Sequence, residues 1–138
     1  MMAHRTKNIL LTEKREKSDL KDLLDPEKNI IKLGGEIFFI VINNQPIATA
    51  AMIANQKNSY ELAKMTVKKE FRGRGYSKLL LKRCIDFAKK RSAKEIYLIS
   101  NSKLKIARKL YDNHGFIRVA LDNKKYHRGD LKMVLYLK

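Results

Sequence analysis

Alternating and periodic apolar positions divide the first half of the chain into three strands. An aromatic and β-branched run at residues 37–42 predicts a buried strand. The polar residues 43–46 read as a turn, after which a second apolar run spans 47–53. A further polar break precedes residues 60–67, which alternate between apolar and polar side chains. We therefore expect an antiparallel meander of three strands.

The second half of the chain mixes helical and strand periods. Apolar residues recur near every 3.6 positions over 76–91, which predicts a helix, and the short apolar run at 95–100 is typical of a buried strand. Because this strand follows a helix, we expect it to pair in parallel with the strand that ends at Val67. A second helix is predicted over 103–113, with Gly115 as its left-handed cap.

Weaker patterns lie at the two ends of the chain. Leucines at helical spacing predict an amphipathic helix over 12–25, which Pro26 is expected to close. Residues 116–121 begin a strand, and strict alternation over 131–137 predicts a last, half-buried antiparallel strand. If that last strand lies at a sheet edge, it offers a pairing surface for a homodimer.

Length and composition indicate one globular domain. The 138 residues, 44% of them hydrophobic and 33% charged, fit a single domain over 1–138. We find neither an apolar run long enough to span a membrane nor a signal peptide, so we expect a cytoplasmic protein without a membrane partner. The single cysteine, Cys84, lies within a helical pattern and reads as a packing residue.

A glycine-containing loop between a strand and a helix carries the clearest chemical signal. Gly73 and Gly75 let the backbone approach a ligand and aim unpaired amides at it, which suits phosphate. Arg72 and Arg74 add positive charge there. A dinucleotide-binding fingerprint would need a third glycine where Lys78 stands, and a P-loop would need Gly-Lys-Ser/Thr, so neither motif matches.

The loop resembles the pyrophosphate-binding motif of the GNAT acetyltransferase superfamily. That motif is Arg or Gln, two residues, Gly, one residue, then Gly or Ala, and here it reads Arg72, Gly75 and Ser77. Ser77 departs slightly from this motif, which has Gly or Ala at that position. The resemblance extends over residues 34–133, through hairpin, strand, loop, helix, strand and the later segments in the family's order.

The resemblance implies a fold and a cosubstrate. We expect an α/β (α+β) fold with a mixed, mostly antiparallel central sheet, a parallel and splayed strand pair, and flanking helices. Acetyl-CoA is the implied cosubstrate, and no metal is implied. The residues expected to contact CoA are Met65, Val67, Arg72, Gly73, Arg74, Gly75, Tyr76, Ser77, Asn101 and Ala107.

Two residues are candidates for acid–base catalysis of amine acetylation. Tyr111 matches the family's tyrosine near the CoA sulfur and is the candidate acid; the alternative is a ring packed in the core. Glu61 is the candidate base, because it opens the strand that leads to the cofactor and would share a face with Ala63, Met65 and Val67. The alternative for Glu61 is an exposed carboxylate at a strand edge.

The acceptor side is less specified. Lys64 either pairs with Glu61 or holds an acidic substrate, and Tyr126 with Arg128 forms either a substrate loop or a basic surface loop. The family usually places a strand and one or two helices before the hairpin, whereas only residues 1–33 are available here; residues 8–11 read as a vestigial first strand. The expected acceptor is a small-molecule or peptide amine.

The charge balance fits more than one function. Lys and Arg number 31 against 14 Asp and Glu, a formal net charge of +17. Such a surface attracts polyanions and gives non-specific nucleic-acid affinity at low salt. The charge is therefore compatible with a CoA enzyme, with a non-catalytic module that binds nucleic acid or acyl-CoA, and with a merely lysine-rich proteome.

Overall fold

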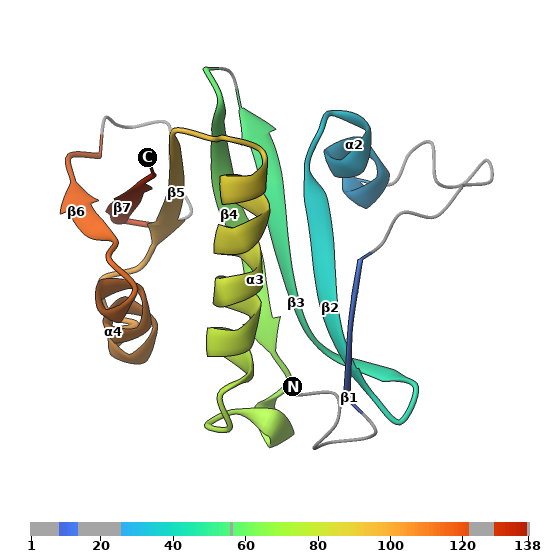
Figure 1. The fold of residues 1–138 in the computed structure, drawn as a ribbon. Helices are drawn as coiled ribbons and strands as arrows, with labels where there is room; N and C mark the ends of the chain where they lie inside the picture. The colour runs from blue at the N-terminus through green and yellow to red at the C-terminus, as the bar shows by residue number, and fades with distance from the viewer. Residues whose placement is uncertain (1–8, 14–25, 56, 122–128, 138) are drawn as a thin grey trace.

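The computed structural model describes residues 9–13, 26–55, 57–121 and 129–137 of the chain. In chain order the elements are β1 (Ile9–Glu13), α2 (Pro26–Lys32), β2 (Glu36–Ile42), β3 (Gln45–Asn55), β4 (Ser59–Val67), the short 3-10 helix η2 (Lys69–Phe71), α3 (Tyr76–Lys90), β5 (Glu95–Ser100), α4 (Lys105–Asn113), β6 (Ile117–Val119) and β7 (Leu131–Tyr136). Three consecutive strands, β2 to β4, are followed by helices interspersed with the later strands (Figure 1).

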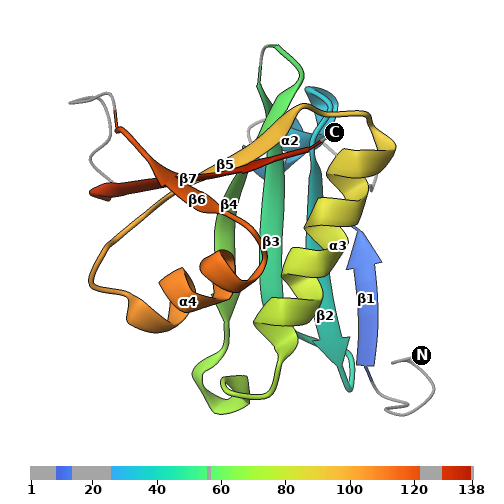
Figure 2. The same ribbon diagram turned by 60° about the vertical axis from the view of Figure 1, so that its left-hand side comes forward.

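The seven strands of the described residues form one sheet in the order β1-β2-β3-β4-β5-β7-β6. The pair β4–β5 is parallel, and every other pair of neighbouring strands in this sheet is antiparallel. Helices α3 and α4 lie on one face, and α2 lies on the other (Figures 1 and 2). The structure thus confirms the expected mixed, mostly antiparallel sheet with flanking helices.

Each face of the sheet has its own apolar core. Helix α3 buries Leu80, Leu81, Cys84 and Ala88, which recur at helical spacing and pack on the side chains of the central strands. On the opposite face, Ile30 of α2 packs in a smaller cluster with apolar residues of β2 and β3. Helix α2 therefore covers the β2–β3 half of its face. None of the helices in the described ranges combines the length and the apolar character needed to span a bilayer.

The N-terminal prediction is partly wrong. Residues 12 and 13 belong to β1, which pairs antiparallel with β2, so the vestigial first strand is present and longer than expected. The rest of the helix expected over 12–25 lies outside the described residues. Pro26 itself is the first residue of helix α2. Proline suits the first helical position, because its missing N–H has no intrahelical partner there in any case.

Two further expectations about the sheet need correction. The β2–β3 turn is shorter than residues 43–46: Asn43 and Asn44 alone form it, with φ values of 50° and 65°, the left-handed geometry of a two-residue hairpin. Strand β7 is not an edge strand, because it lies between β5 and β6. An intersubunit pairing through β7 is therefore blocked, since both of its edges are already hydrogen-bonded within the chain.

The parallel pair separates soon after it forms. Strands β4 and β5 pair over three positions, Ser59 with Glu95, Tyr60 with Ile96 and Glu61 with Tyr97. Strand β4 then continues to Val67 and β5 to Ser100, and the two strands diverge (Figure 2). This is the splayed pair that the family resemblance implied.

A bulge in β4 changes which face its side chains occupy. Ala63 pairs with Ala51 and Thr66 with Thr49, so β4 carries one more residue than β3 between these positions. Lys64 has a left-handed φ of 51° at this point. One extra residue reverses the alternation of side chains along a strand. Odd-numbered residues before the bulge therefore face the side of the sheet opposite to odd-numbered residues after it.

Candidate active site

The glycine loop lies between the end of β4 and the start of α3. Gly73 and Gly75 have φ values of 76° and 86°, in the left-handed region where a side chain is strained. A Cβ atom at either position would meet nothing within 4 Å, so the backbone on this side of the loop is open to a ligand. Gly75 is the N-cap of α3 and provides no side-chain cap. The first amides of α3 therefore point at an accessible, electropositive site.

The side chain of Arg72 makes a hydrogen bond that holds the loop in place. Its Nε atom donates to the main-chain carbonyl oxygen of Val67 at 2.9 Å. This bond closes the chain over η2 and ties the loop to the end of β4. The remaining guanidinium nitrogens keep their charge for an anion.

An aromatic pair stabilises the other side of the loop. The Arg74 guanidinium lies 5.3 Å from the centroid of the Phe71 ring, and the Phe71 and Tyr76 rings are 6.3 Å apart. Arg74 is exposed, and Ser77, in the first turn of α3, is half-buried. The predicted loop residues are thus gathered at one end of α3.

Tyr111 is the one residue of α4 that is buried, at 8% exposure. Its ring packs against that of Phe116 at 5.7 Å. Burial raises the pKa of the Tyr111 hydroxyl above its usual value, and the proximity of Cys84 on α3 adds to the effect. The hydroxyl therefore stays protonated at neutral pH. The ring thus packs in the core, which does not exclude a catalytic role for the hydroxyl.

Cys84 is fully buried in α3 and is not a nucleophile. Burial raises the pKa of its thiol to about 12, although the charge of Arg83 acts in the opposite direction. Cys84 follows Gly75 by nine residues, so Tyr111 approaches α3 about 13 Å along the helix from the glycine loop.

Asn101 organises the turn that precedes α4. Its Oδ1 atom accepts a hydrogen bond from the Lys103 amide at 2.9 Å, and its carbonyl oxygen accepts one from the Leu104 amide at 2.9 Å. These bonds shape the turn but do not cap the helix, because the N-cap of α4 is Leu104 and receives no side-chain cap bond. Ala107, one turn before Tyr111, is half-buried and packs on the core.

The bulge corrects the expected face of Glu61. Glu61 and Ala63 pair with Ile53 and Ala51, which belong to the α2-side core, so they lie on the face of the sheet opposite α3. Met65 and Val67 follow the bulge and pack in the α3-side core. Strict alternation over the whole strand was therefore the wrong assumption, because the extra residue at position 64 reverses it.

Lys64 is exposed at the bulge itself. The side chains of Ala63 and Met65 lie on opposite faces of the sheet. This change occurs beyond Glu61, the last residue of β4 that pairs with β5.

The predicted substrate loop lies largely outside the described residues. Tyr126 and Arg128 belong to the range 122–128, and their expected roles in substrate binding stay predictions. The chain after them is anchored: Asp130 accepts hydrogen bonds from the Ser102 amide at 2.8 Å and from its hydroxyl at 2.7 Å. These two bonds hold the pKa of Asp130 below its usual value. They join the start of β7 to the turn after β5.

The sequence patterns missed Tyr97, which lies next to Glu61, and Lys132, which contacts Tyr97. Tyr97 is the partner of Glu61 in the parallel pair, and Lys132 of β7 places its Nζ atom 5.1 Å from the centroid of the Tyr97 ring. Only the register of the sheet brings these residues together. The sequence predicted that the two strands pair in parallel, but it did not predict which residues lie opposite each other.

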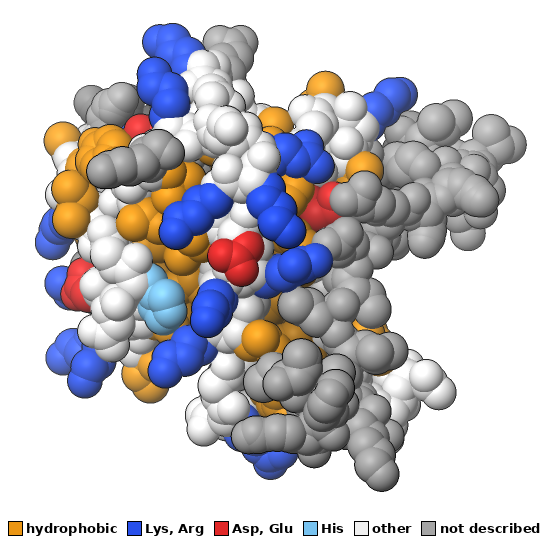
Figure 3. Space-filling view, viewed as in Figure 1, with side chains coloured by type: hydrophobic (Ala, Val, Ile, Leu, Met, Phe, Trp, Pro, Cys, Tyr) orange, Lys and Arg blue, Asp and Glu red, His pale blue; other side chains and the backbone are white. Residues whose placement is uncertain are grey.

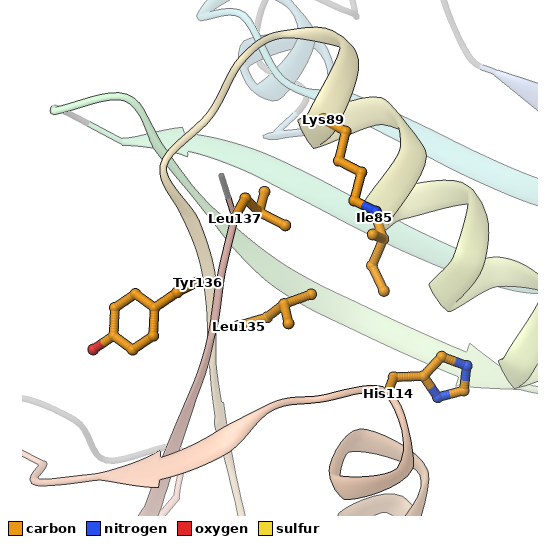
Figure 4. Close-up of a pocket in the computed structure, with 6 residues that line it drawn as sticks. All are labelled: Ile85, Lys89, His114, Leu135, Tyr136 and Leu137. Atoms are coloured by element: carbon orange, nitrogen blue, oxygen red, sulfur yellow. The ribbon is translucent and has the colours of Figure 1, made fainter.

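A cavity of about 570 Å³ lies elsewhere, between the second half of α3 and β7. Figure 4 shows Ile85, Lys89 and His114 around it, together with Leu135 and Leu137, while Tyr136 points away. Ile85 and Lys89 follow Gly75 by 10 and 14 residues, about 15 to 21 Å along the helix. This cavity is therefore separate from the glycine loop. The described residues contain no group of three or more His, Cys, Asp or Glu placed to hold a metal ion.

Comparison with curated proteins identifies relatives among acetyltransferases. The N-acetylaspartate synthetase of Danio rerio is 34% identical over 100 residues, which cover 71% of this chain and 36% of that protein. The N-acetylaspartate synthetase of Rattus norvegicus is 30% identical over 97 residues, covering 69% of this chain and 32% of that protein. The chain thus spans about a third of the length of these relatives.

Solved structures share the fold over nearly the whole chain. A GNAT-family acetyltransferase from Staphylococcus aureus Mu50 has a TM-score of 0.80 at 24% identity, covering 94% of this chain and 99% of that one. A GNAT-family acetyltransferase from Elizabethkingia anophelis with acetyl-CoA bound has a TM-score of 0.69 at 19% identity, with coverages of 94% and 99%. The family model described as "Acetyltransferase (GNAT) family" matches residues 4–116. The chain therefore belongs to the GNAT acetyltransferase family.

Proposed function

We propose that this chain transfers an acetyl group from acetyl-CoA to a primary amine by direct attack in a ternary complex. The observation that carries the proposal is the open glycine loop at the N-terminus of α3, at the side of a parallel strand pair that separates. The amides and the positive end of the helix suit a pyrophosphate, and the separation leaves β4 accessible beyond the last paired residue.

The donor half of the reaction follows from this arrangement. The pyrophosphate of CoA binds at Gly73, Gly75 and the first turn of α3, with Arg72 and Arg74 supplying charge. The pantetheine arm runs from there toward Tyr111, about 13 Å along α3. The Elizabethkingia anophelis neighbour, whose structure contains acetyl-CoA, supports acetyl-CoA as the cosubstrate.

In the chemical step, the neutral amine nitrogen attacks the thioester carbonyl carbon. A C–N bond forms, the C–S bond breaks, and CoA leaves as a thiolate. We assign the amine proton to Glu61, directly or through a water molecule. Tyr111 returns a proton to the thiolate, and its hydroxyl is in the protonated form that a general acid needs at neutral pH. Main-chain amides near Val67 stabilise the negative charge that develops on the carbonyl oxygen.

The acceptor in this proposal is the amine of a small molecule or of a peptide. The curated relatives are named N-acetylaspartate synthetases, and this favours an amino acid amine over a protein lysine. Lys64, exposed at the bulge, and the loop with Tyr126 and Arg128 are proposed to border the acceptor.

Two measurements test the proposal. Calorimetry with acetyl-CoA is expected to show saturable binding with a dissociation constant on the order of micromolar. Release of free thiol from acetyl-CoA is expected to depend on an added amine. A panel of amines should include amino acids, polyamines and short peptides.

The same measurements identify the competing functions. Saturable acetyl-CoA binding without thiol release from any amine in the panel would indicate a non-catalytic acyl-CoA module. A lack of acetyl-CoA binding, together with DNA binding that weakens steeply with salt, would indicate a nucleic-acid module. Figure 3 shows basic side chains spread over the face that carries α3, so weak polyanion binding at low salt is expected in either case.

A further inference from the structure

A second, polar pocket lies on the face of the sheet opposite α3. It has a volume of about 380 Å³ and is formed by the end of β3, the β3–β4 turn, the beginnings of β4 and β5, and β7. The side chains that line it include Asn55, Lys57, Lys94, Tyr97 and Lys132. Helix α2 covers the β2–β3 part of this face, and the pocket lies beyond it.

The register of the sheet places this pocket beside Glu61. Ser59 lines the pocket and precedes Glu61 by two residues, which is about 7 Å along the strand on the same face. Tyr97 also lines the pocket and is the direct partner of Glu61 in the parallel pair. A small molecule in the pocket can therefore extend one end toward Glu61 and the bulge, where we place the chemical step.

The pocket is basic. Three lysines, Lys57, Lys94 and Lys132, line it together with one acidic residue, Glu95. The Glu95 carboxylate is engaged by the Ser59 hydroxyl, which donates to it at 3.4 Å. The positive charge of these lysines repels a cationic ligand and attracts a carboxylate.

Two contacts hold the side chain of Tyr97 in place in the pocket. Its hydroxyl oxygen accepts a hydrogen bond from the Asn55 Nδ2 atom at 2.8 Å, which fixes the ring from one end. The Lys132 ammonium lies over the ring face, 5.1 Å from the centroid. Lys132 is therefore held beside the partner of Glu61 rather than extended into solvent.

Hydrogen bonds join the chain segments around the pocket. The Lys94 amide donates to the Asn58 carbonyl at 2.9 Å, and the Asn58 side chain donates to the Ser92 carbonyl at 2.8 Å. The Leu137 amide donates to the Lys94 carbonyl at 2.8 Å. The β3–β4 turn, the start of β5 and the end of β7 are thus joined, and the lysines extend from a preorganised frame.

From these observations we infer that the pocket is a carboxylate-binding subsite for the acceptor, and that the acceptor is a small amine bearing an acidic group. This inference rests on the proposed function, because it assigns the substrate class of the same reaction. The amine points toward Glu61, and the carboxylate is held by Lys132 with the long-range attraction of Lys57 and Lys94.

The test compares acidic amines with their uncharged analogues on the full chain. Thiol release is measured with L-aspartate against L-asparagine and with L-glutamate against L-glutamine. The kcat/KM is expected to be at least about tenfold higher for the acid of each pair, as a charge-assisted hydrogen bond would give. Equal values for acid and amide in both pairs would overturn the inference.

The variant Lys132→Gln removes the charge that lies on Tyr97. The KM for the acidic amine is expected to rise about tenfold to a hundredfold, with kcat and the KM for acetyl-CoA within about twofold of the wild type. Lys57→Gln, in the turn, is expected to cause a smaller rise and gives a second measurement should Lys132→Gln fold poorly. Lys90→Gln, an exposed lysine in the last turn of α3, is the matched control and should leave every parameter unchanged.

The outcomes separate this inference from the proposed function. If acetyl-CoA binds and a neutral amine is acetylated without preference for acids, the carboxylate subsite is wrong and the acetyltransferase stands. If acidic amines are preferred but Lys132→Gln and Lys57→Gln both match Lys90→Gln, the pocket is not the site that recognises them. If acetyl-CoA itself does not bind, the acetyltransferase function and the subsite both fail.

Discussion

The Nε atom of Arg72 donates a hydrogen bond to the carbonyl oxygen of Val67 at 2.9 Å, and this bond joins the first residue of the glycine loop to the last residue of β4. Strand β4 is where the acetyl group would react, and the loop is where the pyrophosphate would bind. One side chain therefore sets the position of the two halves of the donor site relative to each other.

Replacement of Arg72 by alanine should weaken acetyl-CoA binding more than it weakens catalysis. The bond to Val67 is lost and so is one positive charge, so the KM for acetyl-CoA should rise about tenfold or more while kcat falls less. Arg72→Gln keeps a donor of suitable length and should retain part of the affinity. Steady-state kinetics with both variants would reveal the difference, and identical losses in the two would argue against the tether.

Gly75→Ala should disturb the loop through backbone strain rather than through a clash. Gly75 has a φ of 86°, and a Cβ there meets no atom within 4 Å. The strain for an alanine is about 1–2 kcal/mol. That corresponds to a fall in melting temperature of roughly 2–8 °C, with weaker CoA binding in calorimetry. Gly75→Asn is the control, because asparagine tolerates this conformation better; a melting temperature as low as that of the alanine variant would point to a different cause.

Tyr111→Phe should lower kcat by about a hundredfold if the hydroxyl protonates the departing thiolate. Burial raises the pKa of Tyr111, so the protonated form persists through neutral pH and is lost only above about 10. The wild type should therefore lose kcat as the pH rises beyond that value, and the variant should lack this alkaline limb. Tyr136→Phe, at an exposed tyrosine that points away from the core, is the control (Figure 4). Superimposable pH profiles for Tyr111→Phe and the wild type would leave Tyr111 with a packing role.

Glu61→Gln should separate catalysis from cosubstrate binding. The amide keeps the shape of the carboxylate but does not accept the amine proton, so kcat/KM for the amine should fall about a hundredfold. Calorimetry should show an unchanged dissociation constant for acetyl-CoA. Asp86→Asn, an exposed acid on α3, makes the same chemical change away from the site and should be silent. Undiminished turnover in Glu61→Gln would assign proton removal to a water molecule or another residue.

Cys84 should make the fold sensitive to alkali. The thiol has a pKa of about 12 in the folded chain against 9.0 in its reference state, so the unfolded chain releases this proton first. The resulting stability is complete below pH 9 and is lost as the pH rises toward about 12, at about 1.4 kcal/mol per pH unit. Urea unfolding from pH 8 to 10 should show a steeper loss for the wild type than for Cys84→Ala. Parallel pH dependences in the two proteins would contradict the assigned shift.

The local sequence was sufficient for most elements, because helices and strands are encoded by the period of their apolar residues. The pattern at 95–100 gave the bounds of β5, and that at 76–91 gave α3 to within one residue. The helix expected before Pro26 shows the limit of such patterns, since proline is compatible with the end of one helix and with the start of another.

The sequence by itself determined the geometry of the proposed donor side: Gly73 and Gly75 at the start of a helix adopt left-handed backbone conformations, and nearby residues control that local geometry. The acceptor side depended on tertiary structure. The bulge at Lys64 places Glu61 on the face opposite Met65, and the pairing of Glu61 with Tyr97 brings Glu61 beside the ring that Lys132 contacts. Both arrangements follow from strand register. Register is set by contacts between residues distant in the chain, and the period of a single strand does not contain it.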